Sequence, residues 1–181
     1  MNSKNVLVIS ASPRRGGNSD LLADAFMQGA QEAGHDVAKI SLREKKIGFC
    51  KGCLGCQKTQ QCVLRDDMDA ILPRMQRTEV IAFAGPVYFY SLCGQLKTLL
   101  DRTNPLFASE YAMRDIYLLA SAADTAESAV DGSITALEGW VSCFEKVRLR
   151  GSVRALGVTE AGDVRRTPAA LDAARELGRN I

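Results

Sequence analysis

The sequence predicts an α/β domain in which helices cover both faces of a doubly wound sheet of five parallel strands. Two observations lead to this fold class. Short, nearly continuous apolar runs, typical of strands buried on both faces, alternate with longer segments whose apolar residues recur at helical spacing. The length of 181 residues fits one domain and is short for two. We therefore expect a single domain over residues 1–181, without internal repeats or linkers.

The first part of the chain contains two predicted strands with a helix between them. An apolar run predicts a strand at residues 5–10, and a polar turn follows at residues 12–19. Apolar residues at helical spacing then predict a helix at residues 21–33, which Gly34 ends. A second strand is expected at residues 36–42. The next segment, at about residues 43–66, shows no period, and we interpret it as a cysteine-rich insertion loop.

The second part of the chain continues the alternation. Aspartates at the start of its first helix favour that helix N-terminus. In chain order, we expect a helix at 67–76, a strand at 79–84, a helix at 92–102, a strand at 115–121, a helix at 129–147, a strand at 153–158 and a helix at 168–178.

The polar turn after the first strand is a candidate anion site. In an open α/β sheet, ligands bind at the carboxyl ends of strands, where the N-terminus of the next helix accepts an anion. The turn lacks the Gly-Lys-Ser/Thr ending of a nucleotide-hydrolysing loop and the G-x-G-x-x-G of dinucleotide-binding folds. We predict a phosphate site; the alternative is that Asn18 or Ser19 only caps the helix. The candidate phosphate ligands are Ser12, Asn18 and Ser19, with charge from Arg14 or Arg15, and we expect Ser10 and Arg14 among the cofactor-binding residues.

A second candidate segment follows the third strand. Four apolar or aromatic residues at the carboxyl end of a strand could shield a flat ring, while backbone N–H groups bond to its edge. Aromatic residues after a strand more often belong to the core, so this signal is weak by itself. The residues concerned are Pro86, Val87, Tyr88 and Phe89.

Residues 50–62 hold four of the six cysteines, spaced C-x2-C-x2-C-x5-C. Three interpretations stay open: an iron–sulfur cluster, a tetrahedral zinc site, and a reduced, metal-free loop. The candidate ligands are Cys50, Cys53, Cys56 and Cys62. Cys93 and Cys143 lie in helical patterns, so we expect them to be buried apolar residues rather than ligands.

Together these motifs resemble the NAD(P)H-dependent FMN reductases, which have a flavodoxin-like fold. The resemblance covers about residues 5–105 and is carried by Ser12-Pro13-Arg14 with Asn18-Ser19, Gly85-Pro86-Val87-Tyr88, Gly94-Gln95-Leu96-Lys97 and Asp101-Arg102. The four clustered cysteines, followed by Asp66-Asp67-Met68, resemble the branch of iron–sulfur flavoproteins. The tight spacing of the cysteines, the glycines between them and a reducing compartment favour a [4Fe–4S] cluster as the occupant.

The resemblance also implies the cofactor, its site and the assembly. FMN would place its phosphate in the turn at residues 12–19 and its ring against Pro86–Phe89, in a homodimer or homotetramer with the flavin near a subunit interface. After the fourth strand, Ser121-Ala122-Ala123-Asp124 takes the place of a Gly-rich stretch that many relatives have near the flavin. Ser121 and Asp124 are therefore further candidate cofactor residues.

The expected function is that of an FMN-dependent oxidoreductase, with NAD(P)H as co-substrate and a small molecule or redox protein as acceptor. The flavin would carry the chemistry, so we name no catalytic side chain. The alternative is an electron-transfer module without nicotinamide turnover. A net charge of +2 gives no reason to expect nucleic acid or a membrane surface as partner. No apolar run approaches the roughly 20 residues that span a bilayer and no leader is evident, so we expect a cytoplasmic protein.

Overall fold

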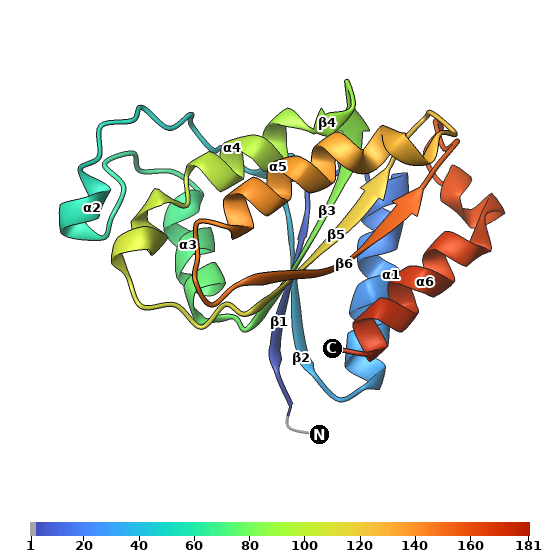
Figure 1. The fold of residues 1–181 in the computed structure, drawn as a ribbon, viewed down its shortest axis with the longest axis horizontal. Coiled ribbons are helices and arrows are strands. Elements are labelled where there is room, and N and C mark those ends of the chain that lie inside the picture. The colour runs from blue at the N-terminus through green and yellow to red at the C-terminus, as the bar shows by residue number, and fades with distance from the viewer. Residues whose placement is uncertain (1–2) are drawn as a thin grey trace.

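The structure, a computed structural model, describes residues 3–181 and is built on a parallel sheet (Figure 1). Its parallel strands lie in the order β2-β1-β3-β5-β6. This is the flavodoxin-like order, 2-1-3-4-5 when only the parallel strands are counted. The strands are β1 (Asn5–Ser10), β2 (Asp36–Ser41), β3 (Val80–Tyr88), β5 (Asp115–Ser121) and β6 (Arg148–Ala155). The α/β class and the parallel sheet are thus confirmed.

The sheet has six strands rather than the five expected. The additional strand, β4 (Ser91–Leu92), pairs antiparallel with the end of β3. A two-residue turn joins them, in which Phe89 and Tyr90 have φ angles of 49° and 59°. Such hairpin turns usually carry Asn or Gly, because those residues adopt positive φ at low cost. Phe89 and Tyr90 are therefore not residues from which this hairpin could be predicted.

The last strand also begins earlier than predicted, at Arg148 instead of residue 153. It lies at the edge of the sheet, and its first five residues alternate between exposed and half-buried. An edge strand of this kind has no continuous apolar run, which explains the missed boundary.

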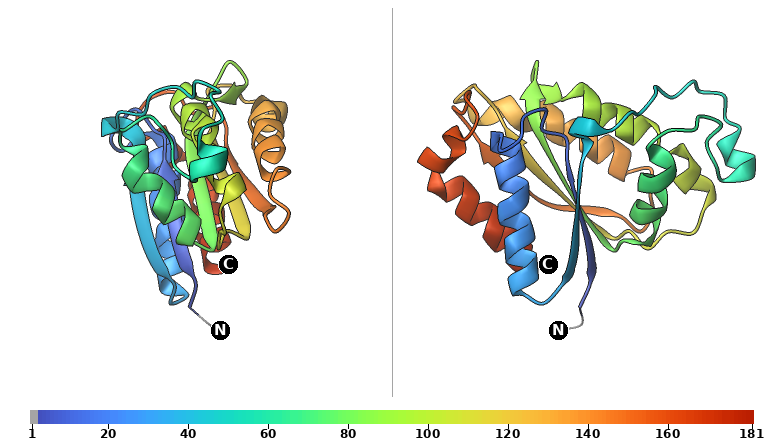
Figure 2. Two further views of the ribbon diagram at one scale, coloured as in Figure 1. Left: turned by 90° about the vertical axis from the view of Figure 1, so that its left-hand side faces the viewer. Right: turned by 180° about the vertical axis from the view of Figure 1, so that it is seen from behind.

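Helices cover both faces of the sheet (Figures 1 and 2). One face carries α1 (Asn18–Glu32) and α6 (Pro168–Arg179), which pack side by side. A Cβ atom at Gly29 or Gly178 would overlap the backbone of the other helix, so these two helices need glycine at their contact. The opposite face carries α3 (Met68–Arg77), α4 (Gly94–Asp101) and α5 (Asp131–Val141). Each face has its own apolar core.

The helix predicted at 129–147 is shorter than expected: α5 ends at Val141 and Cys143 is exposed, whereas Cys93 is buried as predicted. The cysteine-rich segment begins in a short 3₁₀ helix, η1 (Leu42–Glu44), holds the short helix α2 (Cys56–Thr59) and projects at one end of the molecule (Figure 1). No helix within residues 3–181 has the length and apolar character needed to cross a membrane. The strand order reverses between β1 and β3, and ligands bind at the carboxyl ends of strands at such a point.

Candidate functional site

A cavity of about 220 Å³ lies at the carboxyl ends of β1, β3 and β5. Its walls come from the turn after β1, the end of β3, the segment after β5 and the loop after β6. Most of the residues predicted to bind a cofactor line it: Ser12, Arg14, Asn18, Ser19, Pro86, Val87, Tyr88 and Ser121. The other three, Ser10, Phe89 and Asp124, lie outside its lining.

The turn after β1 is held in shape by its own hydrogen bonds. Ser12 Oγ and the Gly17 N–H both donate to the carbonyl of Arg14, at 2.9 and 3.1 Å. Gly16 has a φ of +62°, and a Cβ atom at Gly17 would lie only 2.6 Å from Ser12 Oγ. The two glycines are therefore needed for a turn this tight.

Helix α1 begins directly after this turn, and no side chain caps it. Gly17 is the N-cap residue, so neither Asn18 nor Ser19 serves as the cap. The first N–H groups of a helix have no partner within the helix, and the residues at this N-terminus, Gly17, Asn18 and Ser19, line the cavity together with Ser12. This arrangement suits an anion such as a phosphate.

The side chain of Asn18 has a different task from the one expected. Its Nδ2 donates to the carbonyl of Glu160 at 2.9 Å, and its Oδ1 accepts the buried N–H of Val164 at 3.1 Å. Arg14 Nη1 likewise donates to the carbonyl of Thr159 at 3.0 Å. Both side chains thus tie the turn to the loop after β6, which closes one side of the cavity.

That loop, residues 157–164, was missed by the sequence analysis, although Val158 and Thr159 line the cavity. Its shape depends on Asp163, whose Oδ2 accepts the N–H groups of Glu160 and Thr159 at 2.8 and 3.2 Å. These bonds, that to Glu160 above all, lower the pKa of Asp163. The signal available in the sequence was the position of this loop after a strand at the ligand-binding edge, together with its glycines, Gly157 and Gly162, which both have a positive φ in the structure.

A polar group lies behind the turn. Ser10 is fully buried and donates to Asp20 Oδ1 at 2.7 Å, and Lys39 Nζ lies 2.8 Å from the same oxygen. Asp20 Oδ2 accepts the N–H of Gly16 at 3.2 Å. Burial alone would raise the pKa of Asp20, but the hydrogen bonds from Lys39 and Ser10 outweigh it and lower the pKa. Ser10 therefore supports the turn from behind instead of facing the cavity.

The turn between β3 and β4 shapes the opposite side of the cavity. Phe89 is fully exposed, while the Tyr90 hydroxyl donates to Asp124 Oδ2 at 2.9 Å. Asp124 Oδ1 accepts the N–H of Ala126 at 2.9 Å. The bond from Ala126, followed by that from Tyr90, lowers the pKa of Asp124. In the structure Asp124 thus anchors the turn, and the backbone after Pro86 is held in place by a partner from the segment that follows β5.

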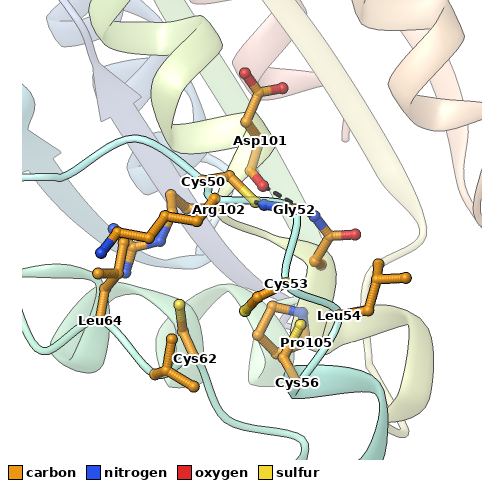
Figure 3. Close-up of a pocket in the computed structure, with 13 residues that line it drawn as sticks. Cys50, Gly52, Cys53, Leu54, Cys56, Cys62, Leu64, Asp101, Arg102 and Pro105 are labelled. Atoms are coloured by element: carbon orange, nitrogen blue, oxygen red, sulfur yellow. Dashed lines mark hydrogen bonds between the residues drawn. The ribbon is translucent and has the colours of Figure 1, made fainter.

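The four clustered cysteines line one pocket of about 20 Å³ (Figure 3). Cys56 is buried, Cys62 half-buried, and Cys50 and Cys53 exposed. Burial, followed by the neighbouring cysteines, raises the pKa of the Cys56 thiol. Within residues 3–181, no three His, Cys, Asp or Glu side chains are grouped closely enough to hold a metal ion. Four thiols around one pocket are nevertheless a donor set that suits a soft metal centre.

The amino-acid sequence is similar to those of known proteins. The family model of NADPH-dependent FMN reductases matches residues 4–142. An iron–sulfur flavoprotein of Archaeoglobus fulgidus is 36% identical over 97 residues, which cover 54% of this chain and 44% of the relative. Another, of Methanocaldococcus jannaschii, is 40% identical over 101 residues, covering 56% and 52%. The chain thus spans about half the length of these curated relatives.

The fold also matches solved structures. An NAD(P)H:quinone oxidoreductase from Methanothermobacter marburgensis superimposes with a TM-score of 0.74 at 22% identity, covering 99% of this chain and 97% of that one. At this identity the match supports the flavodoxin-like fold.

Proposed function

The chain belongs to the family of NADPH-dependent FMN reductases, and we propose that it takes hydride from NAD(P)H with FMN as cofactor and passes electrons to a small-molecule or protein acceptor. The observation that carries the proposal is the uncapped N-terminus of α1, which faces a cavity at the switch point of the sheet. The motifs at both sides of this cavity lie within the part of the chain that the family model matches.

The residues present fit FMN at this site. The first N–H groups of α1 and the hydroxyls of Ser12 and Ser19 would hold the phosphate, and Arg14 would add a positive charge. The backbone at Pro86, Val87 and Tyr88 would border the ring. When bound, FMN supplies hydride acceptance and stepwise release of electrons. The chain contributes position and electrostatics, and we assign no acid or base.

A neighbouring cavity of about 480 Å³ offers a place for the nicotinamide or the acceptor. It shares Tyr88 with the first cavity and is bordered by Phe49, which is largely exposed and directly precedes Cys50. An open, partly aromatic surface beside a flavin suits planar ring substrates.

We propose further that Cys50, Cys53, Cys56 and Cys62 ligate a [4Fe–4S] cluster; the cysteine pocket and the similarity to proteins named iron–sulfur flavoproteins support this. The cluster would supply a one-electron exit. Assembly as a homodimer or homotetramer, and a cytoplasmic location, belong to the same proposal.

The test begins with anaerobic purification, reconstitution and release of the flavin for chromatography. FMN and steady NADPH oxidation with a quinone or free flavin as acceptor would support the proposal. Finding FAD, or no flavin after reconstitution, would refute it. A flavin that is reduced by light but not by NADPH or NADH would favour the second candidate, an electron-transfer module, to which the cysteine pocket and the iron–sulfur relatives also point.

A further inference from the structure

One side chain joins the two ends of the cysteine-bearing loop. Arg102 follows α4, and its side chain is fully buried. Its Nη1 donates to the carbonyl of Gly48, just before the cysteines, at 2.7 Å, and to Asp66 Oδ2, just after them, at 2.6 Å. Its Nη2 donates to Asp66 Oδ1 at 3.2 Å. The guanidinium therefore connects the two ends of the loop, and its contact with the Asp66 carboxylate is bidentate.

Asp66 completes this closure. Its Oδ2 also accepts the N–H of Gly48 at 2.9 Å, and its Oδ1 accepts the N–H of Met68 at 3.0 Å. Burial would raise the pKa of Asp66, but Arg102 and these N–H groups outweigh it and lower the pKa. Asp66 and Arg102 thus form an ion pair, and both carboxylate oxygens of Asp66 have hydrogen-bond donors.

The guanidinium of Arg102, in contrast, has one N–H group that lacks a hydrogen-bond acceptor within residues 3–181. Arg102 Nε is buried and has no hydrogen-bond partner within the part of the chain that the structure describes. A buried N–H without a partner is unfavourable, so a missing acceptor is expected there. Arg102 and Cys62 line the same pocket (Figure 3), and they also border a second cavity together.

We propose that Arg102 is the positioning residue of the cysteine pocket: its Nη groups fasten both ends of the loop, and its Nε–H donates to the Cys62 sulfur when that sulfur ligates a cluster. The inference rests on the proposed role of the cysteines as ligands and goes beyond it. Hydrogen bonds to ligand sulfurs raise the reduction potential of a cluster, and partners outside the ligand set stabilise it. Arg102 should therefore affect both properties.

The experiment compares reconstituted holoprotein with the variants Arg102→Lys and Arg102→Gln. Lysine keeps the positive charge but lacks the Nε–H group and cannot make the bidentate contact with Asp66. Iron loss to a chelator should become about 10- to 100-fold faster, as for other lost partners of metal ligands. The midpoint potential of the cluster should fall in both variants. The matched control is Arg65→Gln, on the same loop, because the Arg65 side chain is largely exposed and its one ion pair within residues 3–181 is with Asp69 at 3.5 Å.

FMN content and thermal unfolding report whether the variants are folded. Bound FMN should persist in Arg102→Lys, and NADPH oxidation by the parent protein tests the proposed flavin function separately. An unchanged potential in Arg102→Lys would overturn the inference, even if iron were lost faster, because it would leave only a structural role. A parent protein that takes up no iron would overturn it as well.

Discussion

Replacing Asn18 with Ala separates two explanations of how the phosphate turn works. The sequence suggested that the Asn18 side chain binds the phosphate. In the structure both of its polar atoms bond to the loop after β6 instead. If the structural role holds, Asn18→Ala should weaken binding of FMN and of riboflavin, which has no phosphate, by similar factors. A phosphate ligand would affect FMN alone.

The magnitude follows from the two lost hydrogen bonds. Each contributes about 1 kcal/mol, and leaving the buried Val164 N–H unpaired adds a further cost, for a total of about 2–3 kcal/mol. For a domain of this size, 1 kcal/mol corresponds to roughly 2–4 °C in the melting temperature, so we expect a decrease of roughly 4–12 °C. The loop that walls the cavity should exchange its amide hydrogens faster.

The assay combines thermal unfolding with titration of apo-protein by FMN and riboflavin. Arg14→Ala is the matched comparison, because its guanidinium is exposed and only one bond to Thr159 is lost. It should weaken FMN more than riboflavin, with little change in melting temperature. If Asn18→Ala keeps the parental melting temperature and weakens FMN alone, the assignment of Asn18 to the loop is wrong.

The elements that the sequence predicted well are those with local signals. The apolar runs of β1, β3 and β5 are buried on both faces, and each is followed by the polar or aromatic segment that borders the cavity. Because parallel strands bring their carboxyl ends to one edge, the fold class alone predicted that the turn at 12–19 and the segment after Pro86 meet.

What the sequence could not predict depends on contacts distant along the chain. Asn18 bonds to residues more than 140 positions later, and Arg102 closes a loop that begins 54 positions earlier. No pattern within a window reveals such partners. The Phe89–Tyr90 turn was missed for another reason: its positive φ angles are supported by tertiary contacts, including the bond from Tyr90 to Asp124.

Three further predictions concern other parts of the structure. Gly132→Ala should weaken FMN binding and lower the melting temperature, because the new Cβ would overlap the carbonyl oxygen of Tyr90 in the β3–β4 turn. The control is Gly139→Ala in the same helix, where the new Cβ meets no atom and alanine should stabilise the protein by up to about 1 kcal/mol. Hydrogen bonds from Arg175 and Arg179 of α6, and a weaker one from Gln28 of α1, lower the pKa of Glu32 from 4.5 to about 2. The contribution of Glu32 to stability is therefore present above pH 4.5 and is lost as the pH falls toward 2. In acid titrations monitored by circular dichroism, Glu32→Gln should lose less stability over this range than the parent protein does. Cys53→Ser should remove most of the iron from reconstituted protein and leave FMN bound, because Cys53 lines the cysteine pocket and not the cavity at α1. The control is Cys143→Ser, which should keep its iron, because Cys143 is exposed and lines neither the pocket nor the cavity. Equal iron in both variants would exclude Cys53 as a ligand.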